Sequence, residues 1–506
     1  MMAGPTLSGR AGIRESKSPA LSERGGIPES KWRAAAPLLV GLAIAVLPVP
    51  SGLAPYAWRY FALFAATIVA LITEPIPAAA IGLIAVTFAG ALGLPFHPIQ
   101  LQDPSFKLPG EALKWALAGF INPTVWLIFG AFVFAMGYQR TGLGRRIALV
   151  LVKRLGARTL GLGYAIALSD LALAPFTPSN TARSAGIIFP VIASIPPLYG
   201  SGQGDPARRI GGYLMWVAFA ATCVTSSMFI TALAPNVLAI ELVRARTGVD
   251  ISWTAWFLGF LPVGALLLAV LPWLVYRIYP PEIRRSAEVP RWAGRELAGL
   301  GRITRNELIM AGLVVTALAL WIAGARLIDP TMVALLGISL MLVTGIVSWA
   351  DVVGNTPAWN VLVWFATLVV LADGLNKVGV VDWFGRGASA LLAAHSPVLV
   401  TATLVALFFV LHYVVAGLAA HTTALLPVMV AAGASIPGVP VRAFAMLMVF
   451  SLGLMGVLTP YACGPSAVYY ESGYLPRADF WRLGLIFGAM FLAALLIIGL
   501  PYLTMR

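Results

Sequence analysis

Residues 176–186 read FTPSNTARSAG and lie between two apolar stretches of the chain. They include one Pro, four Ser or Thr, one Asn and one Arg, although polar and charged groups are costly at the middle of a membrane-spanning helix. Irregular backbone deep in a bilayer is tolerated only against other protein or a water-filled cavity. We therefore interpret the stretch as the tip of a helical hairpin, residues 160–195, that enters the membrane and turns back.

The composition of the whole chain indicates a polytopic membrane protein. Of its 506 residues 59% are hydrophobic and 11% are charged, with a mean hydropathy of +0.88, far from the makeup of a soluble domain. A second stretch with a polar centre, 397–435, predicts a second re-entrant hairpin. Apolar segments that approach the length of a bilayer span, about 20 residues, lie at 34–50, 56–73, 77–94, 123–139, 211–243, 251–276, 306–325, 331–350, 358–378, 441–470 and 480–503. We thus expect an all-α fold with about eleven transmembrane helices and two re-entrant hairpins.

The placement of basic residues predicts how the chain crosses the membrane. The formal net charge is +14, and Lys and Arg gather in the tail 1–33, in the connection 277–305, and at 140–158 and 477–482. By the positive-inside rule these segments are cytoplasmic. An odd number of spans then puts the N-terminus in the cytoplasm and the C-terminus outside. The polar tail is expected to be disordered, and no basic segment has the interleaved aromatics of a nucleic-acid site.

Two cysteines, Cys223 and Cys463, fall inside predicted spans. Two small buried side chains make neither a disulfide framework nor a metal-ligand cluster. The chain also lacks an HExxH motif, a GxSxG elbow and a Cys/His cluster. We therefore expect no cofactor, no bound metal of structural type and no enzymatic activity.

The chain contains an internal repeat. VWLIFGAFVFAMGYQRTGLG (125–144) and VLVWFATLVVLADGLNKVGVV (361–381) are both aromatic-rich spans that end in Gly, two residues, a cation, one residue and a second Gly. Each is followed by an amphipathic segment, a hairpin and a span interrupted in its middle, 211–243 or 441–470. The charge distribution gives the two copies opposite directions, so portions 34–276 and 306–506 hold inverted repeats joined by 277–305. Inverted repeats with broken helices are typical of secondary transporters, whose sites lie near the midplane.

The two hairpin tips offer helix N-termini, which suit anions. In the first, Thr177 and Pro178 end one helix and Ser179 begins the next, with Asn180 and Thr181 in its first turn. In the second, AGLAAHTTALLP (416–427) places three polar residues at the corresponding tip: His421, Thr422 and Thr423. The two helix starts are expected to face each other across the midplane.

The two interrupted spans carry matching residues, in SSMFITALAPN (226–236) and LTPYACGPSA (458–467). Proline in mid-span removes a helical hydrogen bond and frees carbonyls that can bind a cation or water. One such break is explained equally well as a proline kink, whereas four breaks at symmetric positions favour a binding site. The paired candidates are Thr231 with Thr459, Pro235 with Pro465 and Asn236 with Ser466.

Two basic side chains lie within the apolar part of the chain. Arg183 requires an anionic partner, because a charge at this depth costs about 2.5–3.5 kcal/mol on insertion scales. Asp170, on the other arm of the same hairpin, and an anionic substrate are both candidates, and the two can coexist. A lone membrane His is more often a packing residue, but its position opposite Ser179 favours a substrate role for His421. His412 is assigned no function.

These residues resemble the divalent anion/sodium symporter (DASS) family. SNT (179–181), TPSNTARSAGIIFPV (177–191) and LTPYACGPSAVYYESGY (458–474) are similar to its branch of bacterial citrate/succinate and tartrate/succinate antiporters and plastid 2-oxoglutarate/malate translocators. The resemblance covers nearly the whole chain after residue 34. It implies eleven spans and two re-entrant hairpins in a homodimer whose transport domains move like elevators. It also implies a bacterial inner membrane and therefore a periplasmic C-terminus.

In this family two SNT motifs hold substrate carboxylates and line sodium sites, which implies these roles for Ser179, Asn180 and Thr181. The second half departs from the pattern, because Ala420, His421 and Thr422 stand where a second SNT is expected. A second sodium site is therefore in doubt, although a residual one near Asn180 and Thr231 stays open. Fixed cations, Arg183 and His421, are expected to compensate substrate charge instead.

The sequence thus predicts sodium-independent exchange of succinate, malate, 2-oxoglutarate, tartrate or citrate. Sodium-coupled symport is the nearest alternative, and proton coupling through Asp170 or His421 is a third. A channel would need a continuous polar stripe or filter, and the chain has localised breaks instead.

Overall fold

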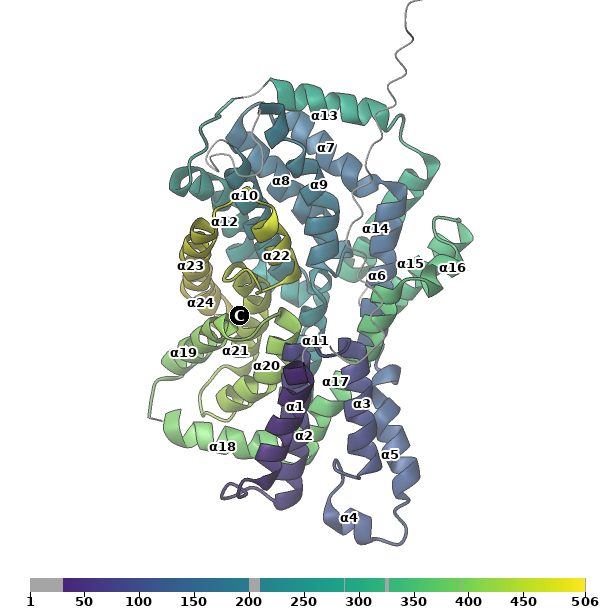
Figure 1. Ribbon diagram of the computed structural model, residues 1–506, viewed down its shortest axis with the longest axis vertical. Helices are drawn as coiled ribbons and strands as arrows, with labels where there is room; N and C mark the ends of the chain where they lie inside the picture. Colours follow the sequence, from purple (N-terminus) through teal and green to yellow (C-terminus); the bar gives the residue numbers. More distant parts are fainter. Residues whose placement is uncertain (1–30, 200–209, 286, 324–326, 393, 506) are drawn as a thin grey trace, which may run out of the picture.

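The protein is a bundle of helices in a computed structural model that describes residues 31–199, 210–285, 287–323, 327–392 and 394–505 (Figure 1). No strand is assigned in these ranges, apart from one isolated bridge between Arg158 and Arg285. The predicted disordered tail falls mostly outside the described residues. The all-α prediction is confirmed.

The helices of the first half run from α1 to α13. They are α1 (Lys31–Val46), α2 (Pro55–Thr73), α3 (Ala78–Ala91), α4 (Pro98–Gln102), α5 (Leu108–Leu117), η1 (Ala118–Ile121), α6 (Pro123–Thr141), α7 (Leu143–Leu155), α8 (Thr159–Leu173), η2 (Ala174–Phe176), η3 (Thr181–Ile188), α9 (Phe189–Ala193), η4 (Pro196–Tyr199), α10 (Gly211–Met228), η5 (Ile230–Ala232), α11 (Ala234–Thr247), α12 (Trp253–Ile278) and α13 (Glu288–Gly299).

The second half continues in the same manner. Its helices are α14 (Arg305–Ala323), α15 (Pro330–Val343), α16 (Trp349–Val353), α17 (Thr356–Lys377), α18 (Val380–Leu392), α19 (Pro397–Val410), η6 (Leu411–Tyr413), α20 (Leu418–Ala434), α21 (Val441–Leu454), η7 (Met455–Val457), α22 (Gly464–Glu471), α23 (Arg477–Ala494), η8 (Leu495–Gly499) and α24 (Leu500–Thr504). The order α6 to α11 is repeated by α17 to α22, while the inversion of the repeats stays a prediction.

Seven helices of the described chain are long and apolar enough to cross a membrane, or up to eight if one bent pair counts as a single span. Several other apolar helices have only 10–17 residues, so the predicted number of eleven spans stays a prediction. The bent pair was not foreseen. Residues 108–121 form α5 and η1, and the chain bends by 42° into α6 at Asn122, whose side chain caps the new helix, and Pro123.

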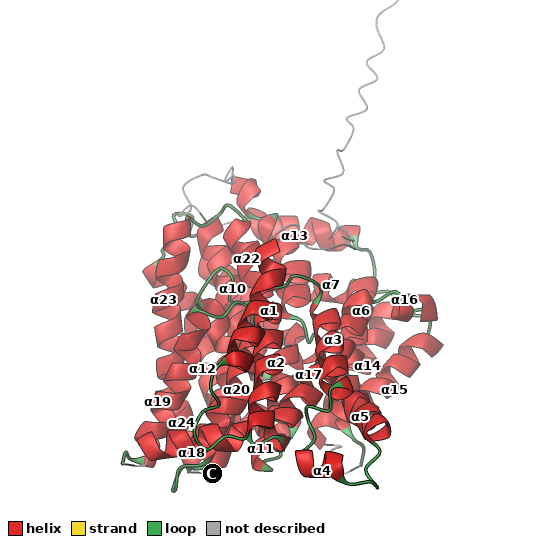
Figure 2. Ribbon diagram, turned by 60° about the horizontal axis from the view of Figure 1, so that its bottom comes forward, coloured by secondary structure: helices red, strands yellow, loops and turns green. Residues whose placement is uncertain are grey.

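Amphipathic helices lie at opposite ends of the bundle. Figure 2 shows α13 along one end, with α7 close to it, and α18 along the other. α7 and α13 pack together and are joined by the Arg145–Glu296 ion pair. α18 packs against α20, and its Asp382 pairs with Arg246 at the end of α11. The pair α7 and α13 thus lies at one end of the bundle, and α18 lies at the other end, against α20 of the second hairpin.

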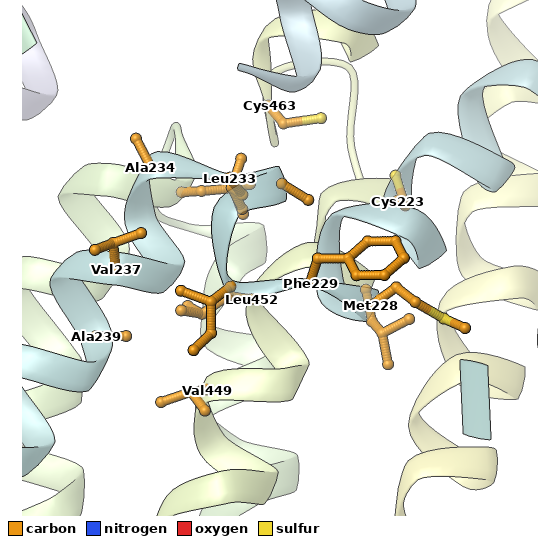
Figure 3. Close-up of a cluster of buried hydrophobic side chains, with 14 of the residues drawn as sticks. Cys223, Met228, Phe229, Leu233, Ala234, Val237, Ala239, Val449, Leu452 and Cys463 are labelled. Atoms are coloured by element: carbon orange, nitrogen blue, oxygen red, sulfur yellow. The ribbon is translucent and has the colours of Figure 1, made fainter. Parts of the chain in front are cut away.

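The helices α10 and α21 form the centre of the molecule, where every residue of α10 is buried. The two helices are joined by the hydroxyl of Ser227, which donates to the carbonyl of Phe450 (2.7 Å) and accepts from the N–H of Leu454 (3.1 Å). This hydroxyl thus bridges two backbone groups that would pair with each other in a regular helix. Beyond α10, the apolar side chains around the first interruption, among them Phe229 and Leu233, fill the surrounding space (Figure 3).

Candidate functional site: two hairpin tips and two broken helices

The first hairpin tip is an irregular segment between η2 and η3. Pro178 precedes Ser179, whose Oγ accepts a hydrogen bond from the N–H of Ala182 (3.1 Å), so Ser179 caps the new helix as predicted from its sequence. Asn180 is buried, whereas Thr181 is exposed. The helix that follows, η3, has the wider π-type hydrogen bonding that is often found at functional sites. One hydroxyl of the SNT motif is therefore accessible beside a helix N-terminus.

Arg183, one turn after the tip, is fully buried and directed into protein rather than toward the exposed Thr181. Its Nε donates to Asp170 Oδ2 at 3.1 Å, so the ion pair within the hairpin is present. Its Nη1 donates to two backbone carbonyls, of Thr177 in the tip (2.9 Å) and of Ala232 in the first interruption (3.0 Å). Its Nη2 donates to hydroxyls of α10: Thr222, Thr225 and Ser226, at 3.0–3.4 Å.

This network shows that one of the two candidate partners of Arg183 is present. The guanidinium pairs with the carboxylate of Asp170 and reaches six acceptors in all, while compensation of substrate charge by Arg183 stays a prediction. Thr225 also donates to Asp170 Oδ2. Because the desolvated charge is already compensated within the hairpin, a substrate is not needed to stabilise Arg183 in this conformation.

The first interrupted helix is fastened to the first tip. α10 ends at Met228, Phe229 and Leu233 are extended, and α11 begins with Pro235 in its first turn. The N–H of Ala234 donates to the carbonyl of Pro178 (2.8 Å). Thr231 Oγ1 donates to the carbonyl of Pro175 and therefore faces the hairpin.

The side chain of Asn236, at the start of α11, reaches back across the break to the end of α10. Its amide donates to the carbonyls of Ser226 (2.7 Å) and Phe229 (3.1 Å), near the end of α10. These carbonyls lose helical partners at the interruption, so the amide of Asn236 stabilises the break, while its role in binding a ligand stays a prediction. Its Oδ1 has no partner in the described chain.

The second tip lies one helical turn earlier than predicted. The chain turns through 411–417, and α20 begins at Leu418 after Gly417, which has a φ of 77°. His421 is therefore inside the helix, and its N–H donates to the carbonyl of Gly417. Two hydroxyls bond back to the helix itself, from Thr422 to Leu418 and from Thr423 to Ala419.

His421 is fully buried, and neither ring nitrogen has a hydrogen-bond partner in the described residues. Its ring packs edge-on against Phe408, with centroids 4.4 Å apart, and against His412, at 4.9 Å. A protonated imidazole here would be a buried charge without a partner in the described residues, which is costly.

The second interrupted helix is fastened to the second tip by different groups. The N–H of Gly417 donates to the carbonyl of Tyr461 (3.2 Å), and Tyr461 Oη donates to the carbonyl of Tyr413 (2.8 Å). His412 Nε2 bonds the carbonyl of Ala462 at 3.0 Å. His412, assigned no function from sequence, is therefore part of this connection.

The residues predicted from the second interruption lie at the start of α22. Pro465 is in the first turn after the extended Cys463, and Ser466 Oγ accepts from the N–H of Cys463 (3.1 Å) and donates to the carbonyl of Pro460 (2.9 Å). Thr459 is fully buried and its hydroxyl has no partner in the described chain. Ser466 thus has a capping role, and Thr459 is left with a free hydroxyl.

The two halves meet where the first tip touches the second interruption. A Cβ added at Gly464 would lie 1.9 Å from Thr181 Oγ1, so the exposed Thr181 rests directly on the start of α22. Three residues after Thr181, Ser184 Oγ lies 2.8 Å from the hydroxyl of Tyr469. The sequence analysis singled out none of Gly464, Ser184 or Tyr469, although the adjacent Gly464 and Pro465 are a signal of close backbone approach.

Cavities open toward both ends of α6. One of about 550 Å³ adjoins its start and reaches Thr231 at the first interruption. The other, of about 560 Å³, adjoins its end and is lined by Gln139, Arg145 and Gly186 of η3. The first cavity thus reaches the first interruption, whereas the second lies beside η3 of the first hairpin.

Comparison with known proteins agrees with this architecture. The family described as "Sodium:sulfate symporter transmembrane region" matches residues 29–505. The chain belongs to this family. The resemblance drawn from the SNT and TPYACGPS motifs is thereby confirmed, and so is a multi-pass membrane protein.

Two relatives and one solved structure are informative. The chain is 52% identical over 477 residues to the citrate/succinate antiporter of Escherichia coli (strain K12), covering 94% of this chain and 98% of that protein. It is 49% identical over 475 residues to the L-tartrate/succinate antiporter of the same strain, with 93% and 98% covered. The Alcanivorax borkumensis YdaH transporter shares the fold with a TM-score of 0.54 at 15% identity, over 85% of this chain and 97% of that one.

Proposed function

We propose that this protein exchanges di- or tricarboxylates across a membrane. The observation that carries the proposal is the identity of about half the residues, over nearly the whole chain, with antiporters named for citrate, tartrate and succinate. Succinate is common to both names and is the first substrate to test. Malate, 2-oxoglutarate, tartrate and citrate have the same carboxylate chemistry. No chemical conversion of the substrate is proposed.

The site we propose lies between the two tips and the two interruptions. Thr181 and Gly464 are exposed at the contact of the two halves, beside the helix starts of η3 and α22. Free N–H groups at such starts, together with Ser179 and Asn180, suit one carboxylate. We propose that His421, whose two ring nitrogens have no partner in the described residues, binds the other carboxylate after a local rearrangement. Thr422 and Thr423 follow it in the sequence, and Thr459 lies at the matching break.

We propose that transport does not use sodium. The guanidinium of Arg183 already holds the carbonyls of Thr177 and Ala232, which are the kind of freed backbone oxygens that bind cations at broken helices. In the second half His421 replaces the Asn of an SNT motif. Sodium-coupled symport is the alternative, and a residual site near Asn180 and Thr231 is its strongest support.

The proposed setting is a bacterial inner membrane, with the N-terminus in the cytoplasm and the C-terminus in the periplasm. The basic residues of α7 and of the segment around α13 support this orientation by the positive-inside rule. The protein is further proposed to act as a homodimer that moves its transport domains like elevators.

The test is uptake of labelled succinate into proteoliposomes with and without succinate inside. We expect uptake at least tenfold faster into loaded vesicles, and external citrate or tartrate should compete if they share the site. Equal uptake into empty and loaded vesicles would overturn exchange.

A further inference from the structure

Glu241 lies on α11, the second segment of the first broken helix, and joins this segment to the start of α6. Its Oε1 accepts from the hydroxyl of Thr124 at 2.6 Å, and its Oε2 accepts from the amide of Asn122 at 3.0 Å. Arg244, one turn further along α11, is 3.9 Å from Oε1. The carboxylate is nearly buried, with 9% of the residue exposed. Glu241 has been given no role so far.

The acceptor lies at a favourable place for a negative charge. Asn122 caps α6 through its Oδ1, which accepts from the N–H of Thr124 (2.8 Å), while its amide is left to donate to Glu241. The carboxylate therefore rests at a helix N-terminus, where the dipole favours an anion. Hydrogen bonds to an ionised group are about twice as strong as neutral ones.

The contact borders one of two cavities that open toward the two ends of α6. Glu241, Arg244 and Thr124 line the 550 Å³ cavity at the start of α6, which extends to Thr231. Toward the other end of α6, Thr181 in the first tip and Gly186 in the same helix are exposed, and Gly186 lines the second cavity. α11 and α6 are thus held together on the side away from this opening.

We propose that Glu241 is a positioning residue that fastens α11 to α6 and thereby restrains further opening of the cavity at the start of α6. The inference rests on the proposed function only in that the two sides open in turn. When the broken helix moves relative to α6, both hydrogen bonds break. Their strength therefore sets how the population divides between the two states.

The experiment measures the accessibility of single introduced cysteines in the full-length, detergent-solubilised protein. Leu127→Cys, on α6 in the cavity beside Glu241, reports one side, and Ala467→Cys, exposed on α22, reports the other. The native Cys223 and Cys463 are buried, so the parent protein is the labelling control. The reagent is a fluorescent maleimide, with and without succinate, and each reporter is combined with Glu241→Ala, Thr124→Val or both.

We expect Glu241→Ala to raise labelling at Leu127→Cys about fivefold and to lower it at Ala467→Cys, as a loss of charge-assisted hydrogen bonds shifts the two states in opposite directions. Thr124→Val should act in the same direction, and the double variant should be no stronger than Glu241→Ala alone. Glu296→Ala, which breaks an exposed ion pair between α13 and α7, is the matched control and should change neither reporter.

Faster labelling at both reporters would mean general loosening and would overturn the proposal, as would no change at either. Labelling requires no substrate, so its outcome is independent of whether succinate is exchanged. A protein that shows the reciprocal shift but fails to exchange carboxylates would refute the proposed function and still support the role of Glu241.

Discussion

Arg183 and His421 are basic residues of the first and the second hairpin, and their surroundings are opposite in kind. Arg183 reaches six acceptors, including the carboxylate of Asp170, and joins its hairpin to the first interruption. His421 is equally buried and has no partner for either nitrogen in the described residues. A permanent charge must be compensated wherever it is buried, whereas an imidazole can lose its proton and be buried without a charged partner.

The comparison separates structural from binding roles. In the first half Arg183 connects the tip to the break, and in the second half the neutral His412 does so through the carbonyl of Ala462. His421 is then left over as the group whose hydrogen-bonding capacity is unused. The first half is therefore held by a charged group, and in the second half His421 is the group that we propose binds the substrate.

The largest effect is expected from removing the buried guanidinium of Arg183 in the first half. Arg183→Ala leaves Asp170 as an uncompensated buried carboxylate, which costs about 3–5 kcal/mol. We expect little monodisperse protein and a greatly lowered Tm in detergent. Replacing both partners, Asp170→Leu with Arg183→Met, should recover part of the loss. An Arg183→Ala protein with the parental Tm that merely binds succinate weakly would place the charge in the substrate site instead.

The contact between the halves gives the next effect. Gly464→Ala places a methyl 1.9 Å from Thr181 Oγ1, so the first tip and α22 must separate. We expect at least a tenfold loss of succinate exchange in a protein that still folds. Gly387→Ala, at a site with open space and an ordinary backbone conformation, is the control and should exchange normally. If Gly464→Ala exchanges at the parental rate, the two halves do not form one site.

His421→Gln tests whether His421 binds the substrate or only packs in the second hairpin. Because neither ring nitrogen of His421 has a hydrogen-bond partner in the part of the chain that the structure describes, Tm should change little, while the KM for succinate should rise about tenfold through loss of one ligand contact. His412→Ala should do the reverse, lowering Tm through the lost bond to Ala462 with a smaller effect on KM. Thermal unfolding and initial exchange rates distinguish the two. A lowered Tm with unchanged KM for His421→Gln would return it to a packing role.

The smallest effect concerns the hydroxyl pair between the halves. Tyr469→Phe removes the partner of Ser184 and should cost about 1 kcal/mol of stability. Ser184→Ala should cost a similar amount, and the double variant less than the sum because the same bond is lost. Additive changes in a double-mutant cycle would show that the two hydroxyls are not coupled.

Part of this arrangement is readable from the sequence. The capping role of Ser179 and the break before Pro235 follow from local chemistry, since a hydroxyl at a helix start and a proline in mid-span act within a few residues. The all-α membrane fold follows from composition alone. Each of these features depends on residues that are neighbours in the chain.

The remainder depends on contacts between distant residues. Asp170 and an anionic substrate were equal candidates for Arg183, because only the folded hairpin decides which lies 3.1 Å away. The second tip was placed one turn late, since the polar His421 marks a helix interior while the turn is made by Gly417 with its positive φ. The closeness of Gly464 to Thr181 joins residues of different halves. α5 was missed because ten residues of mixed polarity give no span signal.

We propose above all that this protein exchanges carboxylates and that fixed side chains replace sodium. The most direct test is the initial rate of labelled succinate uptake into succinate-loaded proteoliposomes, with sodium replaced by choline on both sides. We predict the same rate with and without sodium. A rate that falls at least tenfold without sodium, together with sodium-driven accumulation in empty vesicles, would contradict the account and identify a symporter.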